Sequence, residues 1–186
     1  MSDAVDAAFA AAPREWFLPP AARDRAGFDG PILIGHGQTS SQPRTVRDML
    51  RLLDVRRGHR VLDVGSGSGW TTALLADLIG PSGSVHGVEL EPDLAAWGAE
   101  NLSHGRWPWA SITTAERGVV GDPSHAPYDR ILVSADAPEI PPDLLGQLAD
   151  DARLVLPVLG TMTLLVRIAG TDHVTEHGSY RFVPLR

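Results

Sequence analysis

The sequence predicts an α/β fold with a mostly parallel sheet, helices on both faces of that sheet and a closing antiparallel hairpin. Two observations carry this prediction. From residue 60 onward, short apolar runs typical of buried strands alternate with helical patterns. The first of these runs, Arg60–Val64, leads through a glycine-rich turn into a helix, which is the usual start of a parallel α/β unit.

Residues 1–54 are predicted to form an N-terminal region of helix and loop. Residues 4–11 favour a helix that Pro13 ends or kinks, and residues 17–37 are rich in Pro and Gly and indicate a loop. A second helix is predicted over residues 42–53, because four apolar residues recur there at helical spacing: Val46, Met49, Leu50 and Leu53.

Residues 55–186 are predicted to form the core of the fold. Strands are expected at 60–64, 84–88, 111–115, 130–134, 154–158, 161–168 and 179–183, and helices at 70–79, 92–101 and 141–149. The last two strands would form the closing antiparallel pair. Because the chain shows neither an internal repeat nor a linker, residues 1–186 are expected to be a single domain.

The glycine-rich turn is the most informative segment for function. Its sequence is Gly65-Ser66-Gly67-Ser68-Gly69, and its glycines let the chain turn sharply while a ligand lies against bare backbone. Glu89 follows the next predicted strand, where a carboxylate can hold the two hydroxyls of a ribose. Together these features predict a nucleoside-type cofactor, although the turn alone also fits any α/β protein.

The identity of that cofactor follows from charge. The G-x-G-x-G spacing differs from that of dinucleotide-binding proteins, and the absence of Lys excludes a P-loop. Asp63, just before the turn, would repel a pyrophosphate and attract a cation. S-adenosylmethionine carries a sulfonium and an ammonium group but no phosphate, so the sequence favours it over NAD or ATP.

Composition excludes several other classes of protein. The net charge of −7 argues against a nucleic-acid-binding surface. Without Cys there are no disulfides or thiolate ligands, and the seven His residues lack metal-binding spacing, so no metal site is expected. No apolar run is long enough for a membrane span and the N-terminus has no basic leader. We therefore expect a cytoplasmic protein, acting as a monomer.

The chain resembles protein-L-isoaspartate O-methyltransferases over nearly its whole length. Ile34–Pro43 is similar to the G-Q-T-I-S-Q-P active-site loop of that family, and Phe182–Leu185 is similar to its closing F-V-P-L. Further matching segments lie in the same order as in the family, at residues 12–17, 60–69, 126–131, 135–141, 147–148 and 153–158. The loop and the tail are more specific than the glycine turn.

This resemblance implies a Rossmann-like class I methyltransferase with a seven-stranded sheet. It also implies methyl transfer from S-adenosylmethionine to the free α-carboxylate of L-isoaspartyl residues in damaged proteins or peptides. Ser41 is carried over as the active-site hydroxyl, and Thr39 is expected to help orient the carboxylate. The expected cofactor-binding residues are Gln38, Thr39, Ser40, Ser41, Asp63, Val64, Gly65, Ser66, Gly67, Ser68, Gly69, Glu89, Leu90, Arg117 and Gly118.

The chain departs from the family pattern at four positions. Arg117, which can only donate, stands where the family has an Asp that accepts from the adenine. Either Glu116 replaces that Asp after a one-residue slip or the adenine is held in another way, and Ser40 replaces an Ile. Arg44 follows the loop where an aromatic residue or His is common, and could pair with a substrate carboxylate or lie on the helix surface. Asp136 is expected either to face the substrate and oppose an anion, or to be a turn residue.

These departures leave two other functions open. The first is a related methyltransferase that acts on an Asp carboxylate of one dedicated peptide or protein. The second is a cofactor-binding module without turnover, against which the Gln38–Ser41 loop argues. No general base is needed for either methylation reaction, because a carboxylate is already ionised at neutral pH.

Overall fold

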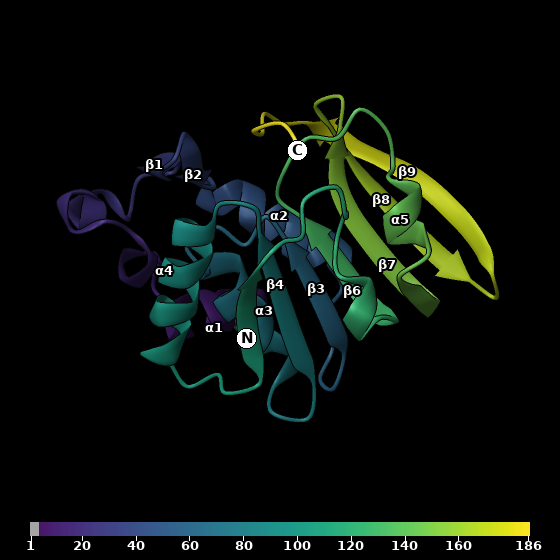
Figure 1. Cartoon of the computed structure of the whole chain (residues 1–186), viewed down its shortest axis with the longest axis horizontal. Helices are drawn as coiled ribbons and strands as arrows, with labels where there is room; N and C mark the ends of the chain where they lie inside the picture. Colours follow the sequence, from purple (N-terminus) through teal and green to yellow (C-terminus); the bar gives the residue numbers. More distant parts are fainter. Residues whose placement is uncertain (1–3) are drawn as a thin grey trace.

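A seven-stranded sheet organises the protein, whose computed structural model describes residues 4–186 and thus leaves out the first three residues of the predicted N-terminal segment (Figure 1). The strand order is β5-β4-β3-β6-β7-β8-β9, with parallel pairing from β5 to β7 and antiparallel pairing of β8 and β9. This confirms the predicted fold class. The strands are β3 (Arg60–Val64), β4 (Ser84–Glu89), β5 (Ala110–Thr114), β6 (Tyr128–Val133), β7 (Leu148–Val158), β8 (Thr161–Ile168) and β9 (Thr171–Ser179).

The helices cover the two faces of the sheet unequally. One face carries α1 (Ala4–Ala11), α2 (Pro43–Leu53), α3 (Trp70–Ile79) and α4 (Pro92–Ser103), which all contribute to one buried apolar cluster. The other face carries the short α5 (Pro142–Leu145), whose Leu144 is buried in a second cluster. Three 3-10 turns, η1 (Arg14–Phe17), η2 (Pro20–Arg25) and η3 (Pro123–His125), complete the described helical segments. No helix within residues 4–186 has the length and apolar composition needed to cross a bilayer.

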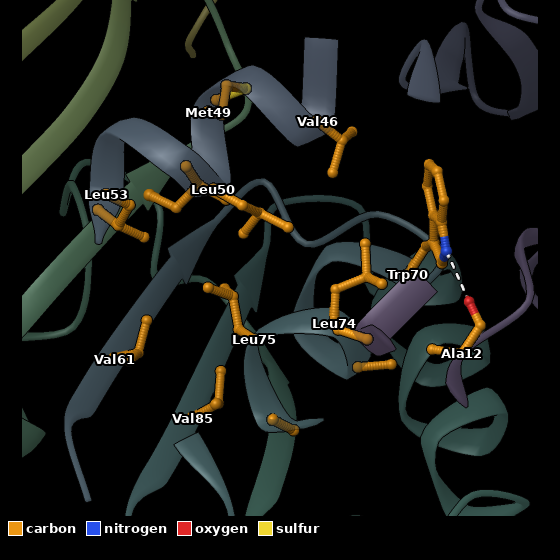
Figure 2. Close-up of a cluster of buried hydrophobic side chains, with 14 of the residues drawn as sticks. Ala12, Val46, Met49, Leu50, Leu53, Val61, Trp70, Leu74, Leu75 and Val85 are labelled. Carbon is orange, nitrogen blue, oxygen red and sulfur yellow. Dashed lines mark hydrogen bonds between the residues drawn. The ribbon is translucent and has the colours of Figure 1, made fainter. Parts of the chain in front are cut away.

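The amphipathic helix α2 shows how the first face is built. Its buried residues Val46, Met49, Leu50 and Leu53 form one stripe, and Figure 2 shows this stripe above Val61 of β3 and the apolar side chains of α3. Burying each such side chain stabilises the fold by about 1.5–3 kcal/mol. In the same cluster the Trp70 indole donates to the carbonyl oxygen of Ala12 over 3.0 Å, which fixes the end of α1 against α3 (Figure 2).

A separate antiparallel hairpin lies beside the sheet. It consists of β1 (Ile32–Gly35) and β2 (Gln38–Ser40), in a region that the sequence indicates is loop. His36 and Gly37 connect the strands with φ values of 51° and 71°, and two successive positive φ values give a tight two-residue turn. The hairpin therefore places Gln38–Ser40 on a paired strand that leads directly to α2.

The predicted helix at 141–149 is present but is shorter than predicted. Only Pro142–Leu145 is helical, and Leu148 already pairs with Tyr128 of β6. The pairing shifts between Tyr128 and Arg130, and Asp151 takes a positive φ of 58°, so β7 begins with an irregular stretch. The start of β7 contains Asp150 and Asp151, and its register shift interrupts the alternation of side chains. The strand therefore lacks the period of two that sequence analysis detects.

The last strand is predicted at residues 179–183, but it lies earlier, at Thr171–Ser179. Strand β9 ends at Ser179, and a tight turn at Ala169 and Gly170 joins it to β8. Because β9 is an edge strand whose residues are nearly all exposed, it has no apolar alternation to detect. The chain after β9 instead runs beside the segment that follows β6, where the amide of Asp136 donates to the carbonyl oxygen of Val183 over 2.7 Å.

Candidate active site

A cavity of about 830 Å³ lies at the carboxyl ends of the parallel strands, where ligands bind in open α/β sheets. Its walls come from parts of the chain that are distant in sequence: the glycine turn, the β1–β2 hairpin, the start of α2 and the C-terminal tail. In Figure 1 the hairpin and the C-terminus both lie in the upper part of the view. Lining residues include Gln38–Gln42, Arg44, Thr45, Asp48, Val64–Ser68, Val88–Leu90, Ala115, Val119–Gly121, Ser134, Ala135 and Gly178–Arg186.

The glycine turn is held by the strand beside it. The amides of Gly65 and Ser66 both donate to the carbonyl oxygen of Val88, at 2.9 and 3.1 Å. The Glu89 carboxylate accepts from the amide of Gly67 through Oε2 and from that of Glu91 through Oε1, each at 3.0 Å. Because each carboxylate oxygen can accept more than one hydrogen bond, Glu89 keeps acceptor capacity toward the cavity that it lines.

Helix α4 supports the same turn from behind. A Cβ atom on Gly98 would lie 2.7 Å from the carbonyl oxygen of Gly67, so only glycine allows this approach. The Asn101 side-chain amide donates to the carbonyl oxygen of Ser68 over 2.9 Å. Sequence analysis missed both residues. A glycine inside a helical pattern is the available signal for Gly98.

Asp63 lies beneath the turn and is fully buried. Its Oδ2 accepts from the hydroxyls of Thr71 and Thr72, both at 2.7 Å, whereas Oδ1 has no partner among the described residues. Burial raises the pKa of Asp63 to about 6 against the opposing effect of those two hydrogen bonds. Burial therefore disfavours the ionised form of Asp63, and its Oδ1 can still accept a hydrogen bond.

Arg14 organises the hairpin from the opposite side. Its guanidinium donates to the hydroxyl and the carbonyl oxygen of Ser40, at 3.1 and 2.9 Å, and to the carbonyl oxygen of Ser41 at 2.8 Å. It also donates to the carbonyl oxygens of Phe28 and Gly30, each at 2.9 Å. Although burial lowers its pKa to about 10, Arg14 remains charged at neutral pH. Sequence analysis assigned Arg14 no function beyond its place in the 12–17 segment.

The C-terminal tail closes another wall of the cavity. The Tyr180 hydroxyl donates to the carboxylate of Asp48 on α2 over 3.1 Å, and Arg186 pairs with Glu91 at 2.7 Å. Arg44 and Arg181 also line the cavity, so three guanidinium groups lie on the walls formed by α2 and the tail. These walls provide positive charge for an anionic ligand.

The structure brings most of the sequence-predicted site residues together on this cavity. Those that line it are Gln38, Thr39, Ser40, Ser41, Val64, Gly65, Ser66, Gly67, Ser68, Glu89 and Leu90. Four others do not line it: Asp63 lies beneath the turn, Gly69 is the N-cap residue of α3, and Arg117 and Gly118 are exposed after β5, as is Glu116. From the segment after β5 the lining is instead Ala115 and Val119–Gly121.

Asp136 does not face the cavity, which corrects one of the two expectations for this residue. Its Oδ1 accepts from the amide of Gly160 in the β7–β8 turn over 2.9 Å, and its backbone pairs with Val183 and Leu185 of the tail. Asp136 therefore connects the β7–β8 turn to the tail, as the turn-residue alternative predicted.

The chemistry of the cavity fits S-adenosylmethionine. The hydroxyls of Ser66 and Ser134, both cavity residues, are buried and have no hydrogen-bond partner among the described residues. Buried polar groups are nearly always hydrogen-bonded, so these atoms are available to a bound polar ligand or water. Together with Glu89 for a ribose and Asp63 near the turn, the donor and acceptor set suits a nucleoside that carries an ammonium group.

The sequence of this chain is similar to those of known methyltransferases. Residues 1–186 match the family described as protein-L-isoaspartate(D-aspartate) O-methyltransferase. A protein-L-isoaspartate O-methyltransferase of Aeropyrum pernix is 46% identical over 159 residues, covering 86% of this chain and 61% of the relative. One from Methanothrix thermoacetophila is 44% identical over 187 residues, covering 100% of this chain and 89% of the relative.

A solved structure adds the cofactor. It is a Plasmodium falciparum protein described as a protein-L-isoaspartate O-methyltransferase, in complex with S-adenosyl-L-homocysteine. Its TM-score is 0.85 at 25% identity, covering 100% of this chain and 91% of that chain. The agreement of sequence, fold and cavity shows that this chain belongs to the protein-L-isoaspartate O-methyltransferase family, whose cofactor is S-adenosylmethionine.

Proposed function

We propose that this chain transfers a methyl group from S-adenosylmethionine to the free α-carboxylate of L-isoaspartyl residues in damaged proteins or peptides. The chain spans 61% of the length of the Aeropyrum pernix relative, so the activity is proposed here rather than carried over from the family. The main support for this proposal is that residues of the glycine turn and the segment Gln38–Ser41 line the same cavity.

Separate groups of residues would hold the ribose and the methionine part of the cofactor. Glu89 would accept from the ribose hydroxyls, and the backbone of Gly65–Ser68 would approach the rest of the molecule closely. Asp63 would stabilise the ammonium group from beneath the turn, directly or through water, with Oδ1 as the acceptor that remains available. When bound, S-adenosylmethionine supplies an electrophilic methyl group on a sulfonium.

The other walls of the cavity would position the substrate. Thr39 and Ser41 would orient the carboxylate through their hydroxyls, and Arg14 fixes the backbone of that hairpin. Arg44 and Arg181 would attract the anionic substrate. Because the carboxylate is already ionised, the protein contributes mainly positioning and the removal of water, effects worth up to about 7–11 kcal/mol in favourable cases.

The position of Asp136 bears on the dedicated-substrate alternative. A carboxylate facing the substrate was one reason to expect a specialised peptide, and the contact of Asp136 with Gly160 removes that reason. The remaining departures that line the cavity, Ser40 and Arg44, are compatible with an isoaspartyl substrate. The Ser40 hydroxyl is bound by Arg14, and Arg44 adds positive charge.

Methyl transfer from radiolabelled S-adenosylmethionine tests the proposal. Two peptides of the same sequence would be compared, one with an isoaspartyl residue and the other with a normal aspartyl residue. We expect label in the isoaspartyl peptide and little in its twin. Label only in a folded partner protein would favour the dedicated-substrate function, and cofactor binding without any transfer would indicate a module that lacks turnover.

Three wider expectations are part of this proposal. We infer that residues 1–186 act as one methyltransferase domain, that the chain works as a monomer, and that it acts in the cytoplasm. Its protein or peptide substrate would be its main partner. Sedimentation of the full chain at several concentrations tests the monomer, since a concentration-dependent mass would contradict it.

A further inference from the structure

Outside the methyltransferase cavity, two imidazoles and one carboxylate converge at the edge of the sheet. His86 lies on β4, Asp122 is the N-cap residue of η3, and His125 is the last residue of η3. Asp122 Oδ2 is 3.1 Å from His86 Nε2 and 2.5 Å from His125 Nδ1. Among the described residues this is the one group of at least three possible ligands whose donor atoms all lie within 4.8 Å of one another.

We propose that His86, Asp122 and His125 form a binding site for a divalent transition-metal ion, with zinc as the first candidate. Two imidazole nitrogens and one carboxylate oxygen suit zinc, copper, nickel or cobalt better than magnesium or calcium, which prefer oxygen ligands. Zinc sites with three protein ligands leave a fourth position for water. This site is separate from methyl transfer, because none of the three residues lines the larger cavity.

The distances fit such a site after a small adjustment. With metal–ligand bonds of about 2.0–2.2 Å, tetrahedral ligand atoms lie about 3.3 Å apart. The pair formed by Asp122 and His86 already has nearly this separation, whereas His125 must move away from Asp122 by roughly 1 Å. The His125 side chain is 61% exposed, so it has room to move.

The surroundings of His86 support its function as a ligand. Its Nδ1 lies 2.8 Å from the Ser111 hydroxyl, which fixes the ring with Nε2 toward Asp122. Metal-binding histidines commonly have such a partner on the second nitrogen. Thr113 also contacts Nε2 at 3.2 Å and would have to release it.

An access path and an open ligand position are also present. A second cavity of about 260 Å³ is bounded by His86, Ser111, His125 and Tyr128. The Tyr128 hydroxyl donates to the Asp122 carbonyl oxygen over 3.0 Å, which helps to fix the loop that carries Asp122. The site therefore combines an oriented, half-buried His86, a half-buried Asp122 carboxylate and an exposed His125 beside a small cavity.

Calorimetric titration of zinc into the chelator-treated, tag-free full chain tests the proposal. We expect one equivalent to bind, and His125→Ala to lower the affinity by about tenfold or more, as expected when a directly coordinating residue is lost. Ser111→Ala should lower it by about tenfold through loss of the second-nitrogen contact. The control His104→Ala removes an exposed histidine at the end of α4 and should leave the affinity unchanged.

Cobalt provides a second, spectroscopic measurement. We expect Co²⁺ to give the intense visible absorption of a low-coordinate nitrogen–oxygen site in the wild type and to lose it in His125→Ala. Absence of zinc binding by the wild type, or equal affinity in His125→Ala and His104→Ala, would overturn the proposal. So would loss of binding in His36→Ala alone, because the His36 ring lies 4.0 and 3.9 Å from Glu91 and Asp93 and would be the true ligand.

Discussion

The two halves of the cavity are held in different ways. On the cofactor side, backbone amides, the Glu89 carboxylate and the close approach of α4 fix the glycine turn. On the substrate side, contacts made by side chains over long stretches of sequence fix the walls, such as Arg14 to Ser41 across 27 residues and Tyr180 to Asp48 across 132. The first half is held within residues 65–101, largely through the backbone of the turn, whereas the second half depends on side chains that connect the N-terminal region, α2 and the C-terminal tail.

This difference fits two of the four departures from the family pattern, Ser40 and Arg44, which line the substrate side of the cavity. In the glycine turn, a Cβ atom on Gly67 would lie 3.2 Å from Ile34 Cδ1 and one on Gly69 would lie 2.9 Å from the carbonyl oxygen of Gly98, so larger side chains fit poorly. Arg14 binds four backbone carbonyl oxygens on the substrate side, which remain available as acceptors when side chains there are exchanged. They belong to Phe28, Gly30, Ser40 and Ser41. The following predictions separate the two halves.

Arg14→Ala should have the largest effect. It removes a buried guanidinium and leaves carbonyl oxygens of the hairpin without donors, so we expect the free energy of unfolding to fall by about 3 kcal/mol or more. Arg14→Lys keeps the charge but lacks the planar fork, and it should recover only part of this loss. Urea denaturation measures both. If the free energy of unfolding fell by less than about 1 kcal/mol in Arg14→Ala, the hairpin would be stable without this guanidinium.

Ser41→Ala should act on turnover rather than on cofactor affinity. Loss of one hydrogen bond to a charged carboxylate costs about 1.5–3 kcal/mol, which corresponds to a fall in kcat of about 10- to 150-fold. Ser41→Thr keeps the hydroxyl and serves as the matched control. Methyl transfer with saturating cofactor gives kcat, and an unchanged value in Ser41→Ala would remove this residue from the mechanism.

Glu89→Ala should act on the cofactor side alone. We expect the affinity for S-adenosyl-L-homocysteine to fall by about 1.5–3 kcal/mol, the cost of losing hydrogen bonds to a charged group. Part of the loss would come from the Gly67 amide, which would lose its acceptor. Glu116→Ala removes an exposed carboxylate outside the cavity and is the control. Equal calorimetric affinities in the two variants would contradict the proposed contact with the ribose.

The raised pKa of Asp63 predicts a pH dependence of cofactor binding. A bound ammonium favours the ionised carboxylate, so the affinity should be full above the pKa of about 6 and fall as pH drops below it. A fully coupled proton gives about a tenfold loss per pH unit. Calorimetry with S-adenosyl-L-homocysteine at several pH values measures this slope. Asp63→Asn cannot titrate and should show a flat profile, and an equally flat wild-type profile would contradict the coupling.

Asp136→Ala should have the smallest effect. Because its carboxylate binds the Gly160 amide, we expect a loss of about 1 kcal/mol in the free energy of unfolding. The KM for neutral and acidic isoaspartyl peptides should stay the same. A lower KM for acidic peptides in the variant, measured at low ionic strength, would show instead that Asp136 repels the substrate.

The sequence by itself determined the fold class, the glycine turn with Glu89, and the loop that carries Ser41. These features are local, because a strand followed by a glycine turn and a helix is encoded by consecutive residues. Helix α3 begins and ends at the predicted residues for the same reason. Strand β9 and the start of β7 escaped prediction because an edge strand and a bulge lack the apolar period that reveals buried strands.

Only the tertiary structure decided which side chains meet. Arg14 reaches the hairpin, Gly98 approaches the turn, and Asp136 binds Gly160 because the chain folds back across the sheet. The histidine spacing argued against a metal site, yet His86 and His125 come within reach of Asp122 across 39 residues of sequence. Spacing rules describe ligands on one element, whereas here the fold brings His86 of β4 to Asp122 and His125 of the η3 segment, which are distant in sequence from it.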